Sequence, residues 1–296
     1  MSKQFSNLVV NRDGTFFVKS RYNKEEDLVL VIGRGGGNGL PDIRRAYTVK
    51  KCGELNDDLT FYRSVLEHET DLIGPSITRS AENGDGDNPE SRFFTGGNHQ
   101  TNNKGTGGGT TARCIAFECT YNGDAVQDIS CCESVDFRWT NLITGYNTSR
   151  IDGGREIIRE DVHMRVSGGK ATVWITQTAL EDIIRETYYG FQMVTPDYPS
   201  IYYVDGKDPG PHPPRIMSTC GDKFCRKIRL ERDTVDTIEI GVEPIGLGNF
   251  ELNKEEFSAF NRHYAKCYFN LIQNNEYLQK KGESVFAEGY FHFYSK

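Results

Sequence analysis

The segment 94–99 reads FTGGNH and combines residue types that can recognise a polar ligand. Gly96 and Gly97 allow a positive φ or a close approach of the backbone to a ligand. Asn98 offers hydrogen-bond donors and an acceptor, and His99 can serve as acid, base or ligand near neutral pH. The pair either forms one wall of a ligand groove or caps backbone groups in a tight corner. The residue types alone allow both interpretations.

Two further segments, 151–161 and 179–192, combine arginine, carboxylate, amide and tyrosine side chains. Arginine and amide groups hydrogen-bond to the rim of a sugar ring, and a tyrosine ring packs on its flat apolar face. These segments predict a saccharide groove on a β-rich scaffold, although the tyrosines could equally be ordinary sheet residues. The predicted ligand-binding residues are Asn98, Arg113, Arg155, Tyr188, Tyr189 and Gln192.

The same residues allow a catalytic alternative, a polysaccharide lyase or a glycoside hydrolase. In that case His99 is the base or acid, Glu156 or Asp152 is the other proton carrier, and Arg155 neutralises a uronate carboxylate. Such an assignment depends on distances that a sequence does not contain. No GxSxG segment is present, so the sequence does not predict a serine hydrolase.

The loop NGDGDNPE (83–90) places oxygen donors, including Asp85 and Asp87, at alternate positions. Such a loop can surround a hard cation, so calcium is a possible ligand, with a plain solvated turn as the alternative. No other cofactor is expected. The glycine-rich segment 33–39 lacks the Gly-Lys-Ser/Thr ending of a phosphate loop and predicts a turn. Cys220 and Cys225 have a spacing compatible with zinc, but no second pair follows.

Composition excludes several classes of function. The chain has 296 residues and a net charge of −7, without a block of basic residues, so nucleic acid is not an expected partner. No apolar stretch is long enough to span a membrane, and the N-terminus has no signal-peptide pattern. We therefore expect synthesis in a cytoplasm and reduced cysteines.

Alternation of apolar and polar residues with period two dominates the chain and predicts strands. Segments 16–23 and 26–33 flank a charged turn, 112–123 ends in the hairpin signal Asn122-Gly123, and 156–180 contains two runs joined by a Ser-Gly-Gly-Lys turn. Glycine-rich turns with little βα alternation indicate an all-β protein, an antiparallel β-sandwich or jelly-roll with long glycine-rich loops.

Helical spacing is rare. Segment 56–68 is compatible with a short helix, and segment 254–273 is compatible with either a helix or a strand, so one or two short helices are expected. The loop-rich stretch 71–111 suggests an N-terminal β segment, 1–70, that packs on or forms part of a main sandwich, 71–296. A single domain over 1–296 is equally compatible with the sequence.

Five short strings carry a resemblance: TDLIGP (70–75), FTGGNH (94–99), TAR (111–113), TNLITGYNT (140–148) and ALEDI…YYGFQ (179–192). Together they resemble tail- and appendage-associated β-rich proteins of bacteriophages and prophages, which work at the carbohydrate surfaces of bacteria. The resemblance covers roughly residues 65–195. It implies a location in the virion, a bacterial surface glycan as partner, and contacts with other virion subunits, with homo-oligomers plausible. A purely structural virion or adaptor protein is a further alternative.

Overall fold

The computed structural model describes residues 6–67, 71–82, 92–98, 109–148, 154–204, 218–219, 225–232, 235–243, 258–261, 265–272 and 276–296. Within these ranges the regular elements are strands, and all of their pairings are antiparallel. The prediction of an all-β antiparallel sandwich is confirmed. No helix in the described ranges is long and apolar enough to cross a membrane.

The N-terminal part of the chain forms a six-stranded sheet of the order β5-β4-β3-β2-β1-β9. Its strands are β1 (Asn7–Arg12), β2 (Thr15–Arg21), β3 (Glu26–Gly35), β4 (Leu40–Lys50), β5 (Arg63–Leu66) and β9 (Ile129–Cys132). The first four are successive hairpins, whereas β9 comes from a later part of the chain and pairs with β1. Segment 1–70 therefore shares a sheet with segment 71–296.

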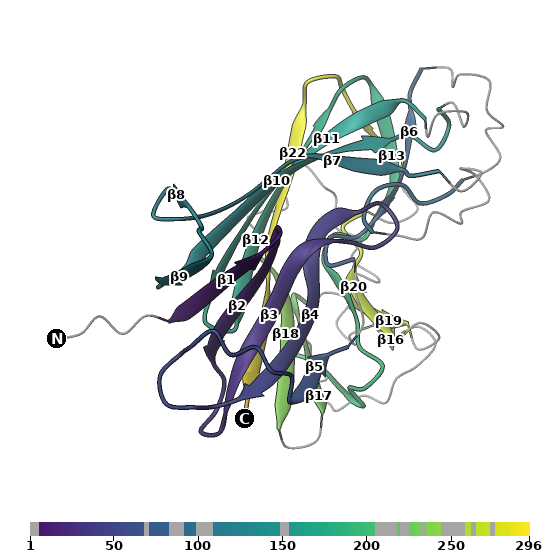
Figure 1. Ribbon diagram of the computed structural model, residues 1–296. Coiled ribbons are helices and arrows are strands. Elements are labelled where there is room, and N and C mark those ends of the chain that lie inside the picture. The colour runs from purple at the N-terminus through teal and green to yellow at the C-terminus, as the bar shows by residue number, and fades with distance from the viewer. Residues whose placement is uncertain are drawn as a thin grey trace.

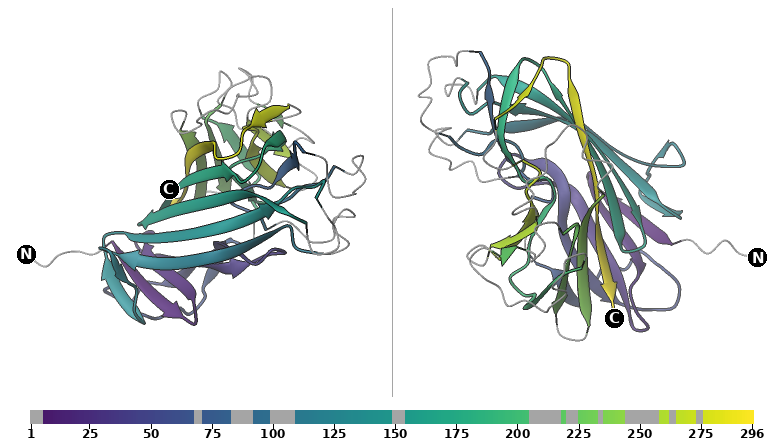
Figure 2. Two further views of the ribbon diagram at one scale, coloured as in Figure 1. Left: turned by 90° about the horizontal axis from the view of Figure 1, so that it is seen from above. Right: turned by 180° about the vertical axis from the view of Figure 1, so that it is seen from behind.

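A nine-stranded sheet of the order β15-β17-β18-β22-β12-β11-β10-β7-β8 forms the second layer. Its strands are β7 (Ala112–Tyr121), β8 (Asp124–Ala125), β10 (Val135–Thr144), β11 (Glu156–Ser167), β12 (Lys170–Ala179), β15 (Ser200–Tyr203), β17 (Lys227–Arg232), β18 (Asp236–Glu243) and β22 (Ser284–Ser295). Figures 1 and 2 show this sheet, in teal to yellow, layered against the purple N-terminal sheet. The C-terminal strand β22 lies inside it, between β18 and β12.

Two smaller sheets adjoin these layers. One has the order β21-β13-β6, from β6 (Ser76–Ser80), β13 (Ile183–Tyr188) and β21 (Tyr277–Gln279). The other has the order β14-β20-β19-β16, from β14 (Gln192–Val194), β16 (Ser218–Thr219), β19 (Ser258–Asn261) and β20 (Lys266–Phe269).

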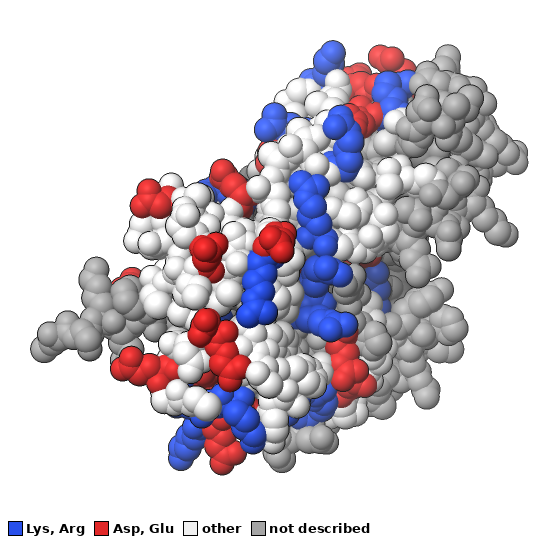
Figure 3. All heavy atoms as spheres, in the orientation of Figure 1, with Lys and Arg blue, Asp and Glu red and all other residues white. Residues whose placement is uncertain are grey.

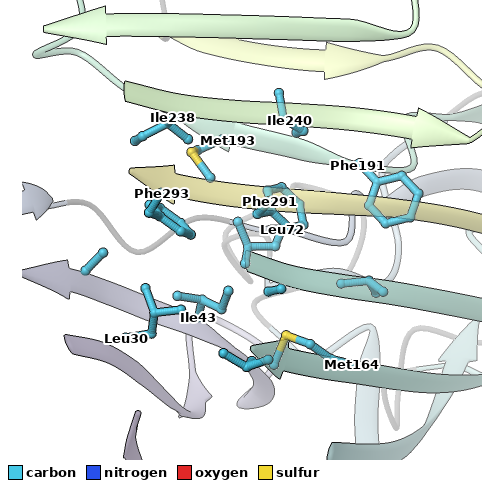
Figure 4. Close-up of a cluster of buried hydrophobic side chains, with 14 of the residues drawn as sticks. Leu30, Ile43, Leu72, Met164, Phe191, Met193, Ile238, Ile240, Phe291 and Phe293 are labelled. Atoms are coloured by element: carbon cyan, nitrogen blue, oxygen red, sulfur yellow. The ribbon is translucent and has the colours of Figure 1, made fainter. Parts of the chain in front are cut away.

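One large core joins the layers, because alternate residues of each strand point inward. Leu30 and Ile43 from the six-stranded sheet belong to the same buried cluster as Met164, Phe291 and Phe293 from the nine-stranded sheet. Figure 4 shows these side chains between the strands of the two layers, beside Ile238, Ile240 and Met193. The burial of this apolar surface is the main force that holds the layers together.

The expected short helices are absent from the described residues. Residues 63–66 form β5, and the described parts of 254–273 form β19 and β20. The helical spacing was misleading because both segments supply strands that pair with neighbours, β5 with β4, and β19 with β20. Strand pairing outweighs a weak local preference.

Candidate functional site

The corner at Asn98 is a structural clamp in this fold. The Asn98 side-chain oxygen accepts a hydrogen bond from the Leu40 N–H at 2.9 Å, and its amide donates to the Leu40 carbonyl at 3.1 Å. The same amide group lies 3.4 Å from the Asp42 carboxylate. Asn98 therefore caps the start of β4, which is one of the two roles that the sequence allowed. Its side chain is also only partly buried.

The glycines around this corner are required by close packing. Gly96 and Gly97 have φ values of 74° and 57°, and a Cβ on Gly97 would lie 3.0 Å from the Pro75 nitrogen. Gly36, in the glycine-rich turn between β3 and β4, has φ 68°, and a Cβ there would collide with the Asn98 side chain. The two glycine-rich segments singled out from the sequence thus contact each other.

Two predicted ligand residues lie in the interior. Gln192 is fully buried, and its amide donates to the Asp71 carboxylate at 3.3 Å. Tyr188 is 1% exposed, so its ring presents no free face to a ligand in this structure. Tyr189 is half-buried between Phe94 and Tyr268, with ring centroids 5.2 Å and 4.7 Å away.

The predicted arginines form ion pairs at one end of the strands β7 and β11 of the nine-stranded sheet. Arg113 binds Glu156 through two hydrogen bonds of 2.5 and 3.1 Å. Arg155 binds Glu181 in the same way, at 2.9 and 3.1 Å. A substrate carboxylate would have to compete with these intramolecular partners. Glu156, one of the predicted proton carriers, already accepts hydrogen bonds from the Arg113 guanidinium.

Several predicted residues lie outside the described ranges, namely His99, Asp152, Asp85, Asp87 and Cys220. In the described part of the chain, no group of three or more His, Cys, Asp or Glu residues is arranged to hold a metal ion.

Beneath the Asn98 corner the structure assembles buried acids that the sequence did not indicate. Asp42 and Glu160 line one small enclosed space together with Asn98, Asn141 and Trp139. Burial raises the pKa of Asp42 well above its usual value, and the nearby charge of Asp71 raises it further. Burial also raises the pKa of Glu160, although hydrogen bonds from Asn141 and Gln177 oppose this shift.

Arg185 completes this interior network. Its guanidinium donates to the side-chain oxygens of Gln177 and Gln279, both at 2.7 Å. Gln177 in turn donates to Glu160 at 2.6 Å, so one chain of hydrogen bonds joins β11, β12, β13 and β21. Burial lowers the pKa of Arg185 to about 10. The group stays charged at neutral pH, and the network locks the small sheet onto the large one.

The outer face of the nine-stranded sheet carries an open groove of about 660 Å³, which we call the tryptophan groove. Among its lining residues Trp174 stacks on His163, with ring centroids 4.8 Å apart and an angle of 25° between the planes. The side chains that share this face come from four adjacent strands and are Ala116, Glu118, Arg138, Thr140, Asp161, His163, Trp174 and Thr176.

The polar groups around the tryptophan groove are held in place by one another. His163 Nε2 donates to Asp136 at 2.5 Å, and Arg165 donates to the same carboxylate at 2.9 Å. Burial opposes ionisation of Asp136, but the bonds from Arg165 and His163 outweigh it and lower its pKa. Thr140 donates to Asp161 at 2.6 Å. The groove thus combines a flat aromatic surface with fixed donors and acceptors.

Sequence reasoning missed this groove because it sought ligands in loops. The signal was present in the alternation of KATVWITQTAL (170–180). Val173 and Ile175 occupy the apolar phase, which leaves Trp174 between Thr172 and Thr176 in the polar phase. A tryptophan in the solvent-facing register of a strand is unusual, and exposed aromatic residues of this kind often contact ligands. Chemically, the arrangement suits binding, since it offers a stacking surface and hydrogen bonds.

Comparison with known proteins does not assign a family. No protein-family model matches the sequence. No curated protein matches it either. Similar solved structures include the α-galactosidase from Lactobacillus brevis, with a TM-score of 0.44 and 10% identity over 100% of this chain and 40% of that chain.

Two other solved structures have similarly low TM-scores and sequence identities. The GH36 α-galactosidase AgaA from Geobacillus stearothermophilus has a TM-score of 0.44 and 7% identity, over 97% of this chain and 40% of that chain. Galactose 1-epimerase from Lactobacillus acidophilus NCFM has a TM-score of 0.36 and 8% identity, over 98% of each chain. The chain spans about two fifths of the length of these galactosidases. Such TM-scores are too low to assign a family or a function.

Proposed function

We propose that this protein is a glycan-binding β-sandwich protein and that saccharide binds in the tryptophan groove. The observation that carries the proposal is the open face of the nine-stranded sheet on which Trp174 stacks against His163. Sugar rings have flat apolar faces and hydroxyl rims, so they suit an aromatic surface bordered by polar groups.

Size and shape support this assignment. The groove volume of about 660 Å³ lies within the range of ordinary small-molecule sites, and the groove is open rather than enclosed. It crosses β7, β10, β11 and β12, whose spacing of about 4.8 Å gives a surface about 14 Å wide. A linear segment of a polysaccharide can lie across such a surface and continue beyond both ends.

The setting that we propose is a bacteriophage or prophage particle, where the protein contacts bacterial surface polysaccharide for attachment to the host. This part of the proposal is supported by the resemblance of five short strings between residues 70 and 192, taken together, to tail- and appendage-associated proteins. Placement in the virion is tested by proteomics of purified particles from a lysogen that encodes the chain.

A glycan array followed by titration calorimetry tests binding. We expect Trp174→Ala to lower the affinity for the best array ligand by at least tenfold, because the stacking surface is lost. The matched control is Tyr62→Ala, which removes an aromatic ring that is 46% exposed but directly precedes β5 of the other sheet. Equal affinity of the wild type and Trp174→Ala for this ligand would refute saccharide binding in the tryptophan groove.

The catalytic alternative has its own readout. Incubation with host wall polysaccharide should release neither reducing nor unsaturated sugar ends if the protein only binds. Release that is lost in His99→Ala would replace the binding proposal with the lyase or hydrolase one. Failure to bind any glycan, together with incorporation into the particle, would favour a structural virion component.

A further inference from the structure

Two carboxylates at the tryptophan groove are neutralised within the protein. Asp161, which lines the groove, pairs with Arg159 at 2.8 Å. Asp136, which holds the ring of the lining residue His163, pairs with Arg165 at 2.9 Å. All of these partners come from β11 or from β10 beside it. The two pairs therefore add little net charge to the groove.

Arg138 and Glu118 are the other lining residues that carry a full charge at neutral pH. They lie directly opposite each other on β10 and β7, where the Cβ atoms of paired residues are about 5 Å apart. Both side chains are exposed, and within the described part of the chain neither makes a hydrogen bond or an ion pair. A guanidinium group only donates hydrogen bonds and a carboxylate only accepts them. The groove thus presents one donor and one acceptor whose charges cancel.

The cross-strand row that contains these two residues continues to the aromatic surface. His163 faces Arg138 from β11, and Trp174 faces His163 from β12. Neighbouring strands are about 4.8 Å apart, so the backbones at Arg138 and Trp174 are separated by about 10 Å. Long side chains on β10 and β7 can therefore reach the hydroxyl groups of a sugar ring that is stacked on Trp174, or those of the next ring along a chain.

The strand on the other side of Trp174 adds a carboxylate at the opposite end of this row. Glu288 faces Trp174 from β22, although it does not line the groove. An anionic saccharide that follows the row would meet Glu118 at one end and Glu288 at the other, with one guanidinium between them. Such a row gives an anionic saccharide no net electrostatic attraction.

We propose that the tryptophan groove selects uncharged saccharides, and that Arg138 and Glu118 together bind adjacent hydroxyl groups. This inference rests on the glycan-binding function proposed above and names the class of saccharide. A hydroxyl group both donates and accepts, so one hydroxyl can accept from Arg138 while its neighbour donates to Glu118. Hydrogen bonds to charged groups of this kind are stronger than those between neutral groups. A carboxylate on the sugar would suit Arg138 but would be repelled by Glu118, and a protonated amine would be repelled by Arg138.

A different surface of the molecule carries concentrated positive charge. Figure 3 shows Lys and Arg side chains gathered over β3 and β4, although the whole chain has a net charge of −7. An acidic oligosaccharide can be attracted to such a surface without entering the tryptophan groove. Binding must therefore be assigned to the groove by its dependence on Trp174.

The test is a glycan array that contains neutral, uronate-bearing and amine-bearing oligosaccharides, probed with the full chain and with Trp174→Ala. We expect the signals that Trp174→Ala abolishes to come from neutral probes such as cellohexaose, maltohexaose and mannohexaose. If those signals come mainly from a galacturonic acid hexamer or a chitosan hexamer, the selection of uncharged saccharides is wrong, but the groove still binds glycan. The absence of any signal that depends on Trp174 would refute the binding function itself.

Two single substitutions test the charge balance with opposite signs. Arg138→Gln should weaken binding of the strongest neutral probe on the order of tenfold, because a hydrogen bond to a charged group is lost. Glu118→Gln should strengthen the Trp174-dependent binding of the galacturonic acid hexamer by about tenfold, because the charge of Arg138 is no longer balanced. Both residues are exposed, so circular dichroism and thermal unfolding should be unchanged. Titration calorimetry measures both affinities.

The matched controls remove one charge of each sign outside the groove. Lys170→Gln changes an exposed cation at the start of β12, and Glu133→Gln changes an exposed carboxylate that precedes β10. Neither should alter the affinity for the neutral probe. That affinity should also be the same at about 50 and about 300 mM sodium chloride, since no ion pair with the ligand is screened. An unchanged affinity for the neutral probe in Arg138→Gln, or no gain for the galacturonic acid hexamer in Glu118→Gln, would overturn the inference.

Discussion

Trp174 and His163 occupy directly opposite positions on β12 and β11, and their rings stack with centroids 4.8 Å apart. Opposite residues of an antiparallel pair have Cβ atoms about 5 Å apart, so the sheet itself imposes this stacking. The imidazole is also held by Asp136 on the next strand, β10. Ligand would therefore meet a surface that is already ordered, which reduces the entropy lost on binding.

The first prediction concerns His163 as a supporting ring. His163→Ala should weaken glycan binding about threefold to tenfold, less than Trp174→Ala, because the indole remains but loses the ring that holds it. His163→Phe should restore most of the affinity, since a ring of similar shape supports the indole without donating to Asp136. Calorimetric titration with the best array ligand measures both variants. Affinity in His163→Phe as low as in His163→Ala would mean that the hydrogen bond, not the stacking, matters.

The second prediction is the acid sensitivity that Asp136 contributes. Its folded pKa is lowered, so the unfolded chain binds more protons in acid, and the stability contributed by Asp136 is present above its unfolded pKa of about 4 and lost as pH falls through its folded pKa. Asp136→Asn should lose this contribution. Urea midpoints measured between pH 2 and 6 should therefore fall less steeply toward acid in Asp136→Asn than in the wild type. If the urea midpoints of the two proteins fall equally steeply toward acid, Asp136 is not the source of this acid sensitivity.

The third prediction separates backbone strain from packing in the turn between β3 and β4. Gly36 and Gly39 have similar φ values, 68° and 64°, but a Cβ would meet Asn98 at Gly36 and nothing within 4 Å at Gly39. Gly39→Ala should cost about 1 kcal/mol in the free energy of unfolding, from the left-handed conformation alone. Gly36→Ala should cost about 2 to 3 kcal/mol, because the Asn98 corner must also move. Chemical denaturation of both variants provides the comparison, and equal losses would show that the contact with Asn98 is unimportant.

The fourth prediction concerns the buried Asp42. Because burial raises its folded pKa, the native state binds more protons than the unfolded chain above pH 4, and the free energy of unfolding should decline as pH rises from about 4 toward the folded pKa. Asp42→Asn should reduce this decline. The substitution also costs a pH-independent amount, because one carboxylate oxygen accepts from the Ile43 N–H and the other from the Leu72 N–H and the Asn98 amide, whereas an amide has only one accepting oxygen. Thermal or urea unfolding of both proteins between pH 4 and 8 gives the slope, and an unchanged slope in Asp42→Asn would rule out Asp42 as its source.

Some features of the candidate sites follow from local sequence, and others do not. The outward phase of Trp174 is readable from the alternation of one strand. Its stacking on His163 requires the β11–β12 register, which the Ser167–Lys170 turn helps to set. The position of Arg44 depends on a register shift between Val31 and Ile32, where Arg44 leaves the regular pattern of β4. No period-two pattern shows which residue a bulge will place on which face.

The sequence by itself determined several strands and their local hairpins, among them β2, β3, β7, β11 and β12. Period-two alternation selects a buried face for each strand, and residues that tolerate a positive φ make the turns: Asn122 and Gly123 have φ values of 50° and 88°, and Gly168 has 58°. Only the tertiary structure decided which distant segments meet. It places β22 between β18 and β12, and it brings Asn98 against Asp42 and Gln192 against Asp71. Those choices depend on the joint packing of many side chains in one core, and such long-range contacts are not encoded in any single segment.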